Sequence, residues 1–201
     1  MGIIEDKKRK KLDNLLDCAF ILFTTKGIEN TSVSDITKKA KVAKGTFYLY
    51  FKNKYEIKDI LIYNKSNEIF NMAKRALDKE DINSFHEKVL FFVDYIVDTL
   101  NNNPVILSFI SKNLSWGVFK KVIIENSEDS KFKTYFDEMI KNSGYEFDNY
   151  EFMFYTILEL VNSTCHNVIL YSEPVHLDVL KKYLYKDIRS IIDNHIIKKD
   201  L

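Results

Sequence analysis

Residues 44–54 carry side chains whose types and spacing suit binding to a polyanion. Phe47 and Phe51 lie four residues apart, so in a helix they share one apolar face that packs inward. Lys44 lies one helical turn before Tyr48, and both leave the helix on another side. The exposed face is therefore cationic and carries a hydroxyl group, and such groups bind phosphate oxygens and base edges. This pattern predicts a helix that contacts DNA.

Residues around this helix extend the same chemistry. Gly45, near its start, has no side chain, which allows backbone N–H groups to approach a phosphate where the helix dipole favours an anion. Tyr50 adds a second hydroxyl group, and Lys52 and Lys54 flank the end of the helix. We therefore include these four residues in the predicted DNA-binding face.

Charge is divided unevenly along the chain. Residues 1–60 contain 13 Lys and Arg against 8 Asp and Glu, a net charge of +5, whereas residues 61–201 contain 17 against 21, a net charge of −4. A basic end on an acidic body favours an anionic polymer as partner. A lysine-rich solvated surface gives the same totals, so charge alone leaves both interpretations open.

The sequence lacks the signatures of the common enzyme classes. Its five glycines are too scattered for a phosphate-binding loop or a dinucleotide fingerprint, and HExxH, CxxC and GxSxG do not occur. His166 follows Cys165, but neighbouring helical residues point in different directions and no second pair completes a metal site. We therefore predict that the protein is not an enzyme and uses no metal or cofactor.

The chain also has the pattern of a cytoplasmic protein. Asp13, Asn14 and Asp17 stand where a secretion signal needs an apolar segment, and no apolar run approaches the ~18 residues of a membrane span. Cys18 and Cys165 lie far apart within apolar helical patterns, which favours buried thiols in a reducing compartment. We expect a cytoplasmic location and no membrane partner.

The elements that position these residues are predicted to be helices. Five glycines and two prolines in 201 residues are too few for many short strands and turns. We predict an all-α fold of about nine helices. Apolar residues recur at helical spacing in residues 10–26, 33–40, 43–51, 54–76, 81–100, 104–110, 114–124, 130–142, 148–170 and 177–191.

The first three of these segments form a predicted three-helix DNA-binding domain, whose helix-turn-helix motif covers about residues 32–53. Ser32 followed by Asp35 three residues later is a capping-box-like start, with Asp in place of the usual Glu or Gln. A short capped helix, a tight turn and a second short helix, backed by an amphipathic helix, is the arrangement that places a recognition helix in the major groove.

Residues 8–60 resemble the N-terminal signature of the TetR (tetracycline-repressor) family. The resemblance rests on Gly27, the capped segment 30–36 and the segment 40–54 with its aromatic recognition helix, in that order. Nothing comparable covers residues 80–201. The resemblance implies a homodimeric repressor that binds a palindromic operator in double-stranded DNA and leaves it when a small-molecule effector enters the body.

The resemblance also assigns residues to the DNA. The positions that contact DNA in the family are occupied here by Lys44, Gly45, Thr46, Tyr48, Tyr50 and Lys54, and the positions where the supporting helix touches the backbone by Ser32 and Ser34. Two residues depart from the family pattern. Ala43 replaces a frequent serine and so removes a hydroxyl contact, and Leu49 favours an apolar contact such as a thymine methyl group.

The body carries candidate ligand contacts. The resemblance implies an apolar cavity in the body. Because the body is rich in aromatic residues and has few charges on its inward faces, such a cavity would suit a largely apolar or aromatic ligand. Tyr155, Glu159, Asn162 and His166 share one helix face as possible polar anchors, although the same face could meet solvent or a dimer partner. The candidate aromatic contacts are Tyr95, Phe109, Trp116 and Phe119.

The last predicted helix carries an apolar seam that we assign to the dimer interface. Its residues are Leu177, Leu180, Leu184, Ile188 and Ile191. An exposed apolar strip usually marks an interface. The predicted organisation is thus a DNA-binding domain over residues 1–54 and an effector-binding and dimerisation domain over residues 55–201. The alternative is an architectural DNA-binding protein of the same fold that responds to no effector.

Overall fold

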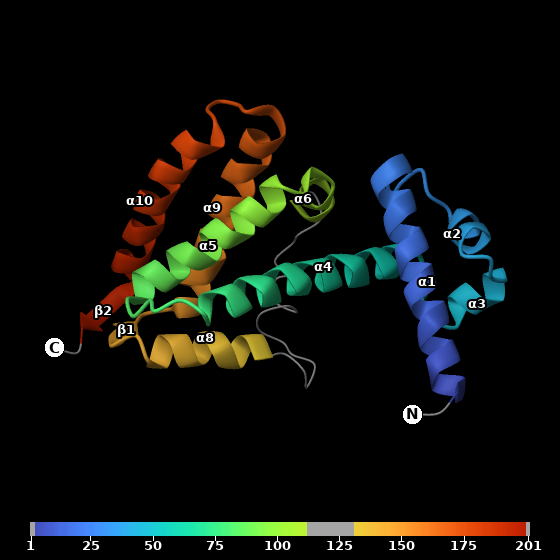
Figure 1. The fold of residues 1–201 in the computed structure, drawn as a ribbon, viewed down its shortest axis with the longest axis horizontal. Helices are drawn as coiled ribbons and strands as arrows, with labels where there is room; N and C mark the ends of the chain where they lie inside the picture. The colour runs from blue at the N-terminus through green and yellow to red at the C-terminus, as the bar shows by residue number, and fades with distance from the viewer. Residues whose placement is uncertain (1–2, 112–130, 200–201) are drawn as a thin grey trace. The chain divides into compact units, whose positions relative to one another are not determined.

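The computed structural model describes residues 3–111 and 131–199, and this part of the chain is built almost entirely of helices (Figure 1). The all-α prediction is confirmed. The helices are α1 (Ile3–Lys26), α2 (Val33–Lys39), α3 (Lys44–Tyr48), α4 (Lys54–Leu77), α5 (Phe85–Asn101), α6 (Pro104–Ser111), α8 (Lys131–Lys141), α9 (Tyr150–Tyr171) and α10 (Leu177–His195). The helix expected over residues 114–124 lies outside the described residues.

Most helix ends follow the local signals in the sequence. Gly27 ends α1 with a φ of +84°, a left-handed conformation that glycine adopts without a steric penalty. Pro104 occupies the first turn of α6, where its missing N–H is not needed. The start of α1 differs, because the helix begins at Ile3 rather than near residue 10 and so includes the basic run Lys7–Lys11.

Two short strands were not predicted from the sequence. β1 (Tyr145–Phe147) pairs antiparallel with β2 (Ile196–Lys199), and Tyr145 lies opposite Lys199. Strands of three and four residues are too short to show an alternating pattern, and their pairing joins segments about 50 residues apart.

None of the helices in the described ranges combines the length and the apolar character that a membrane span needs.

The chain divides into two compact units, Met1–Lys65 and Ser66–Leu201. In the first unit, α1, α2, α3 and the start of α4 surround a small core. Its fully buried side chains include Leu15, Ala19, Ile36, Phe47, Ile57 and Ile62. The side chains of Phe47 and Phe51 contact one another, with ring centroids 5.3 Å apart, so the predicted inward face of the second short helix is confirmed.

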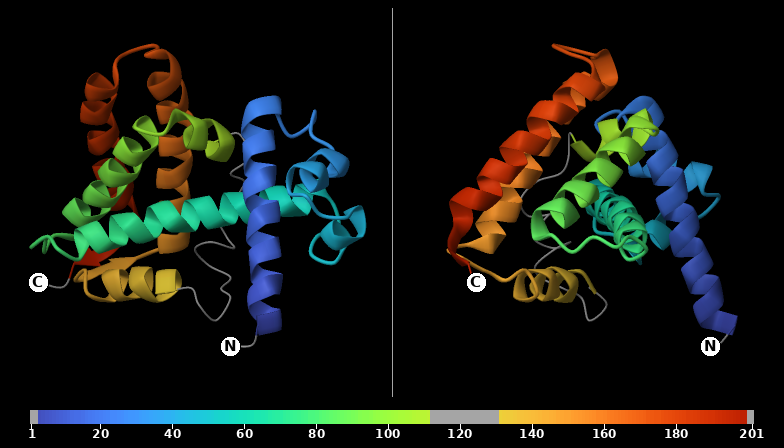
Figure 2. Two further views of the ribbon diagram at one scale, coloured as in Figure 1. Left: turned by 45° about the vertical axis from the view of Figure 1, so that its right-hand side comes forward. Right: turned by 60° about the vertical axis from the view of Figure 1, so that its left-hand side comes forward.

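In the second unit, α9 and α10 lie side by side and run antiparallel (Figures 1 and 2). α5 packs against both helices, and α6 packs against α5 and α9. Met153, Leu184, Ile188 and Ile192 are buried almost completely between these helices. The Lys181 ammonium group lies 2.7 Å from Asp94 and 2.5 Å from Asp98, so ion pairs also join α10 to α5.

Candidate DNA-binding surface and ligand cavity

The helix α2 is held at its start by a reciprocal capping box. The Asp35 N–H donates to the Ser32 hydroxyl oxygen at 3.1 Å, and the Asp35 carboxylate accepts from the Ser32 N–H at 2.9 Å and from its hydroxyl at 2.8 Å. These hydrogen bonds, the backbone one above all, hold the pKa of Asp35 below its ordinary value. The cap predicted from the sequence is therefore present, with Asp in the place of Glu or Gln.

Two side-chain hydrogen bonds tie α1 to the end of α2 and hold the turn between these two helices. The Asn14 amide donates to the Ala40 carbonyl at 2.8 Å, which ties α1 to the end of α2. The buried Thr31 hydroxyl donates to the Gly27 carbonyl at 2.8 Å. Neither role was predicted from the sequence. For Asn14 the reason is that a polar side chain on a helix gives no local sign of a partner 26 residues away.

The outer side of α3 exposes the residues that were predicted to read DNA. Lys44 and Gly45 are exposed, and Tyr48 and Leu49 have exposed fractions of 54% and 81%. The helix ends at Tyr48 rather than continuing to Phe51, so Leu49 is its C-cap residue and lies at the tip of the surface. An ideal Cβ atom on Gly45 meets no other atom within 4 Å, so the protein itself does not require glycine there.

Several of the predicted DNA contacts have partners within the protein. The Lys54 ammonium group donates to the carbonyls of Ile28 at 2.9 Å and Glu29 at 3.1 Å, beside the loop between α1 and α2. The Tyr50 hydroxyl donates to the Lys8 carbonyl at 3.2 Å. Together with Ser32, these residues hold the recognition region in place. Of the remaining predicted contacts, Ser34 and Lys52 are exposed and Thr46 is half-buried.

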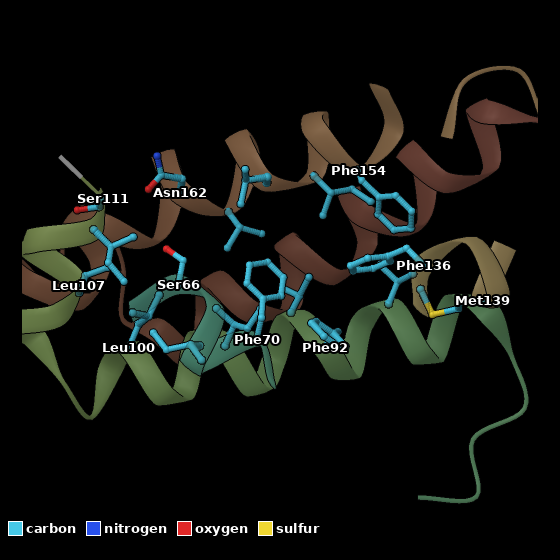
Figure 3. A pocket seen from close by; sticks show the side chains of 18 residues that line it. Ser66, Phe70, Phe92, Leu100, Leu107, Ser111, Phe136, Met139, Phe154 and Asn162 are labelled. Atoms are coloured by element: carbon cyan, nitrogen blue, oxygen red, sulfur yellow. The ribbon is translucent and has the colours of Figure 1, made fainter. Parts of the chain in front are cut away.

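A cavity of about 130 Å³ lies within the second unit (Figure 3). Among the described residues, eighteen from α4, α5, α6, α8 and α9 line it, and three of these eighteen are polar. Phe92, Phe136, Met139 and Phe154 lie toward one end, and Ser66, Ser111 and Asn162 toward the other (Figure 3). The Ser111 hydroxyl lies 2.7 Å from His166 Nδ1. The cavity is therefore apolar with one polar end.

Comparisons with known proteins agree with this arrangement. The sequence profile of the bacterial regulatory proteins of the tetR family matches residues 15–58, from α1 to the first turn of α4. The HTH-type transcriptional regulator YhgD of Bacillus subtilis is 30% identical over 140 residues, which cover 68% of this chain and 71% of YhgD. The chain belongs to the TetR family. It is a DNA-binding transcriptional regulator.

Solved structures of TetR-family regulators share the fold over nearly the whole chain. A transcription regulator from Shewanella sp. PV-4 has a TM-score of 0.67 at 16% identity and covers 94% of this chain and 99% of its own. FadR from Bacillus subtilis, solved in complex with stearoyl-CoA, has a TM-score of 0.61 at 18% identity and covers 88% of this chain and 97% of its own. At these identities the likeness concerns the fold.

The predicted ligand contacts fall in different places in this TetR-family body. Asn162 lines the cavity, and His166 lies behind the lining residue Ser111. Phe109, Tyr155 and Glu159 are outside the lining, and Tyr95 stacks on Phe91 along another side of α5. Trp116 and Phe119 lie outside the described residues.

The aromatic residues that do line the cavity are different ones, namely Phe70, Phe92, Phe136 and Phe154. Several helices of this body carry aromatics at helical spacing. Which of them border a void depends on how the helices pack, so the sequence pattern could not separate them from ordinary core residues.

The seam predicted on α10 needs a correction. Leu184 and Ile188 have exposed fractions of 2% and 0%, so they belong to the core of the chain itself rather than to a surface that a partner can reach. The exposed apolar side chains on this pair of helices are instead Phe152 and Tyr171 at the ends of α9, and Val179 and Tyr183 on α10. Of the other seam residues, Leu177 and Ile191 are half-buried, and Leu180 is half-buried as well.

Proposed function

We propose that this protein is a dimeric repressor that binds a palindromic operator and is released from it by a small, largely apolar ligand. The cavity in the second unit is the observation that carries this proposal, because a body built only for support would bury its apolar side chains without leaving a ligand-sized space. We assign DNA binding to residues 1–54, and effector binding and dimerisation to residues 55–201.

The exposed outer side of α3 and its C-cap supports the assignment of the DNA-reading residues. Lys44 and Tyr48 offer donors to phosphates and base edges, and the highly exposed Leu49 suits a thymine methyl group. Ser34, Thr46 and Lys52 add contacts at the sides. Ser32, Tyr50 and Lys54 act mainly by positioning this surface, through the hydrogen bonds described above.

Exposed apolar side chains on α9 and α10 support the dimer. Tyr183 and Tyr171 have exposed fractions of 66% and 63%, and apolar surface of this kind marks interfaces. A two-fold symmetric contact uses the same patch on both protomers. A two-fold symmetric dimer also matches the symmetry of a palindromic operator, whose half-sites lie in successive major grooves ~34–36 Å apart.

The ligand is proposed to act by shifting the dimer toward a conformation whose recognition helices no longer match that spacing. A ligand can do this only if it binds the two conformations with different affinity. The cavity lining supports an apolar molecule. The stearoyl-CoA bound to FadR of Bacillus subtilis makes acyl chains a sensible first class of probes.

The test uses double-stranded DNA selected from random sequence by repeated binding to the full chain. Fluorescence anisotropy then measures the dissociation constant with and without a panel of acyl-CoA thioesters, long-chain alcohols, aromatic compounds and cationic dyes. We expect the selected DNA to be palindromic and an apolar compound to weaken binding by about tenfold or more, which requires ~1.4 kcal/mol of differential affinity.

A matched variant, Val161→Phe, fills part of the cavity and should keep DNA binding while losing the response to the compound. The alternative is an architectural protein of the same fold without an effector. That alternative would be supported if no compound changed DNA binding and the cavity-filling variant behaved as the wild type.

A further inference from the structure

The hydroxyl group of Ser66 is buried without a hydrogen-bond partner among the described residues. Ser66 lies within α4 and has an exposed fraction of 5%. A serine inside a helix commonly donates to the carbonyl four residues earlier, which is that of Ile62 here, but Ser66 does not. A buried hydroxyl that makes no hydrogen bond destabilises the folded chain, so its position calls for a partner that the described residues do not supply.

The Ser66 hydroxyl points into the cavity toward its polar end (Figure 3). Asn162 lies at the same end, and so does Ser111 with its contact to His166. The opposite end is formed by phenylalanine rings and Met139 (Figure 3). The three polar lining residues thus gather at one end of the cavity, beside Leu100 and Leu107, and an occupant must place its polar group at that end (Figure 3).

The residues that line the cavity determine whether the polar group of a bound molecule can carry a charge. None of the described residues that line the cavity is Lys, Arg, Asp or Glu. Moving an ionised group from water into such a place without an opposite charge is strongly unfavourable, whereas a hydroxyl or carbonyl group needs only one or two hydrogen bonds. Ser66 can donate to a carbonyl oxygen and can accept from a hydroxyl group.

We infer that the cavity binds a molecule with an apolar chain and one uncharged oxygen-bearing head group, such as an alcohol, a ketone or an ester, and that the head group hydrogen-bonds to Ser66. The inference rests on the proposed function, because it specifies the ligand class of the same cavity. It also places the chain of the ligand between Phe92, Phe136 and Phe154.

The test measures binding of 1-decanol, 2-decanone, decanoate and decylammonium to the full chain in the absence of DNA, by isothermal titration calorimetry at neutral pH. The two neutral probes should bind about tenfold or more tightly than the two charged ones. Ser66→Ala should weaken binding of the neutral probes by about threefold to tenfold, the effect of one neutral hydrogen bond. Ser163→Ala, at an exposed serine of α9, should change nothing.

Thermal unfolding without ligand separates this role from a structural one. Ser66→Ala removes an unpaired buried hydroxyl, so the unliganded variant should unfold at the same temperature as the wild type or higher. A structural hydrogen bond would instead make the variant less stable. The inference is overturned if the neutral probes bind Ser66→Ala as tightly as wild type, or if the charged probes bind as well as the neutral ones. Failure of every probe to bind would also remove the effector cavity of the proposed function.

Discussion

The side chains of the helix-turn-helix that were predicted to contact DNA form two groups. Some make hydrogen bonds within the protein, and others remain exposed and available to DNA. The Lys54 ammonium group is bound to two loop carbonyls, and the Tyr50 hydroxyl is bound to the backbone of α1. Their types suit phosphate contacts, but their hydrogen bonds are already made within the chain. Lys44, Tyr48 and Leu49 remain exposed on α3 and at its end.

The double substitution Lys44→Ala with Tyr48→Ala tests this division. It should abolish binding to the selected operator while helicity and dimerisation stay unchanged, because both side chains are exposed. Removing one phosphate-binding side chain should also reduce the steepness of log K against log salt by ~0.9. Anisotropy titrations at several salt concentrations measure both effects. Lys79→Ala, at an exposed lysine of the second unit, is the control, and operator binding by the double variant at wild-type strength would rule out this surface.

Gly45 and Gly27 offer a matched pair of substitutions. Gly45→Ala meets no neighbouring atom and improves the helix, so it should stabilise the chain by up to about 1 kcal/mol, yet weaken DNA binding if a phosphate approaches its backbone. Gly27→Ala should destabilise the chain by about 1 kcal/mol because of its positive φ. Urea unfolding and anisotropy measure the two effects. Unchanged DNA binding by Gly45→Ala would exclude the close approach.

At the scale of elements, two very short helices depend on their ends and on their neighbours. α2 has seven residues and α3 has five, lengths that are not stable as isolated helices. The capping box of Ser32 and Asp35 satisfies the first N–H groups of α2, and Phe47 anchors α3 in the core. The orientation of the proposed DNA-reading surface therefore depends on a cap as well as on apolar packing.

The capping box makes stability depend on pH in a defined direction. Because hydrogen bonds from Ser32 lower the pKa of Asp35 below its ordinary value of 3.8, ionised Asp35 stabilises the folded chain above pH 3.8. This contribution is lost as the pH falls through the lowered pKa. Asp35→Asn should therefore be less stable than wild type at neutral pH, and the difference should shrink below pH 3.8. Urea unfolding across this range measures it, and a difference independent of pH would contradict the assignment.

At the scale of the whole molecule, the pair α9 and α10 has an inner and an outer face. Ile157, Cys165 and Ile188 are buried on the inner face, where burial raises the pKa of the Cys165 thiol to about 11 and keeps it unreactive. Tyr183 and Val179 are exposed on the outer face of α10. Dimerisation through this outer face would leave the core of each chain intact.

Adjacent substitutions on α10 distinguish the two faces. Tyr183→Glu should give folded monomers with weakened operator binding, because it places a charge in the proposed interface. Leu184→Glu should unfold the second unit instead, because it buries a charge without a partner. Lys182→Glu, on an exposed position next to both, is the control. Sedimentation velocity with circular dichroism separates these outcomes, and a wild type that sediments as a monomer at micromolar concentration would contradict the dimer.

Local patterns were sufficient to predict most of the helices and the exposed side of α3. The spacing of Phe47 and Phe51, the Ser32–Asp35 cap and the terminator Gly27 act over four residues or fewer, so the sequence alone carries them. They determine where helices begin and end and which side of α3 is exposed. The family resemblance depended on the same short-range features.

Tertiary packing decided the remaining features. The direction of Leu184 and Ile188, the partners of Lys54 and the pairing of β1 with β2 each involve segments tens of residues apart. The cavity is the clearest case, because eighteen of the described residues border it and they come from five helices. The sequence of a single helix does not specify the space that the other helices leave unfilled. A helical pattern specifies that a side is apolar. Only the packed chain determines whether that side meets a neighbouring helix, a second protomer or an open space.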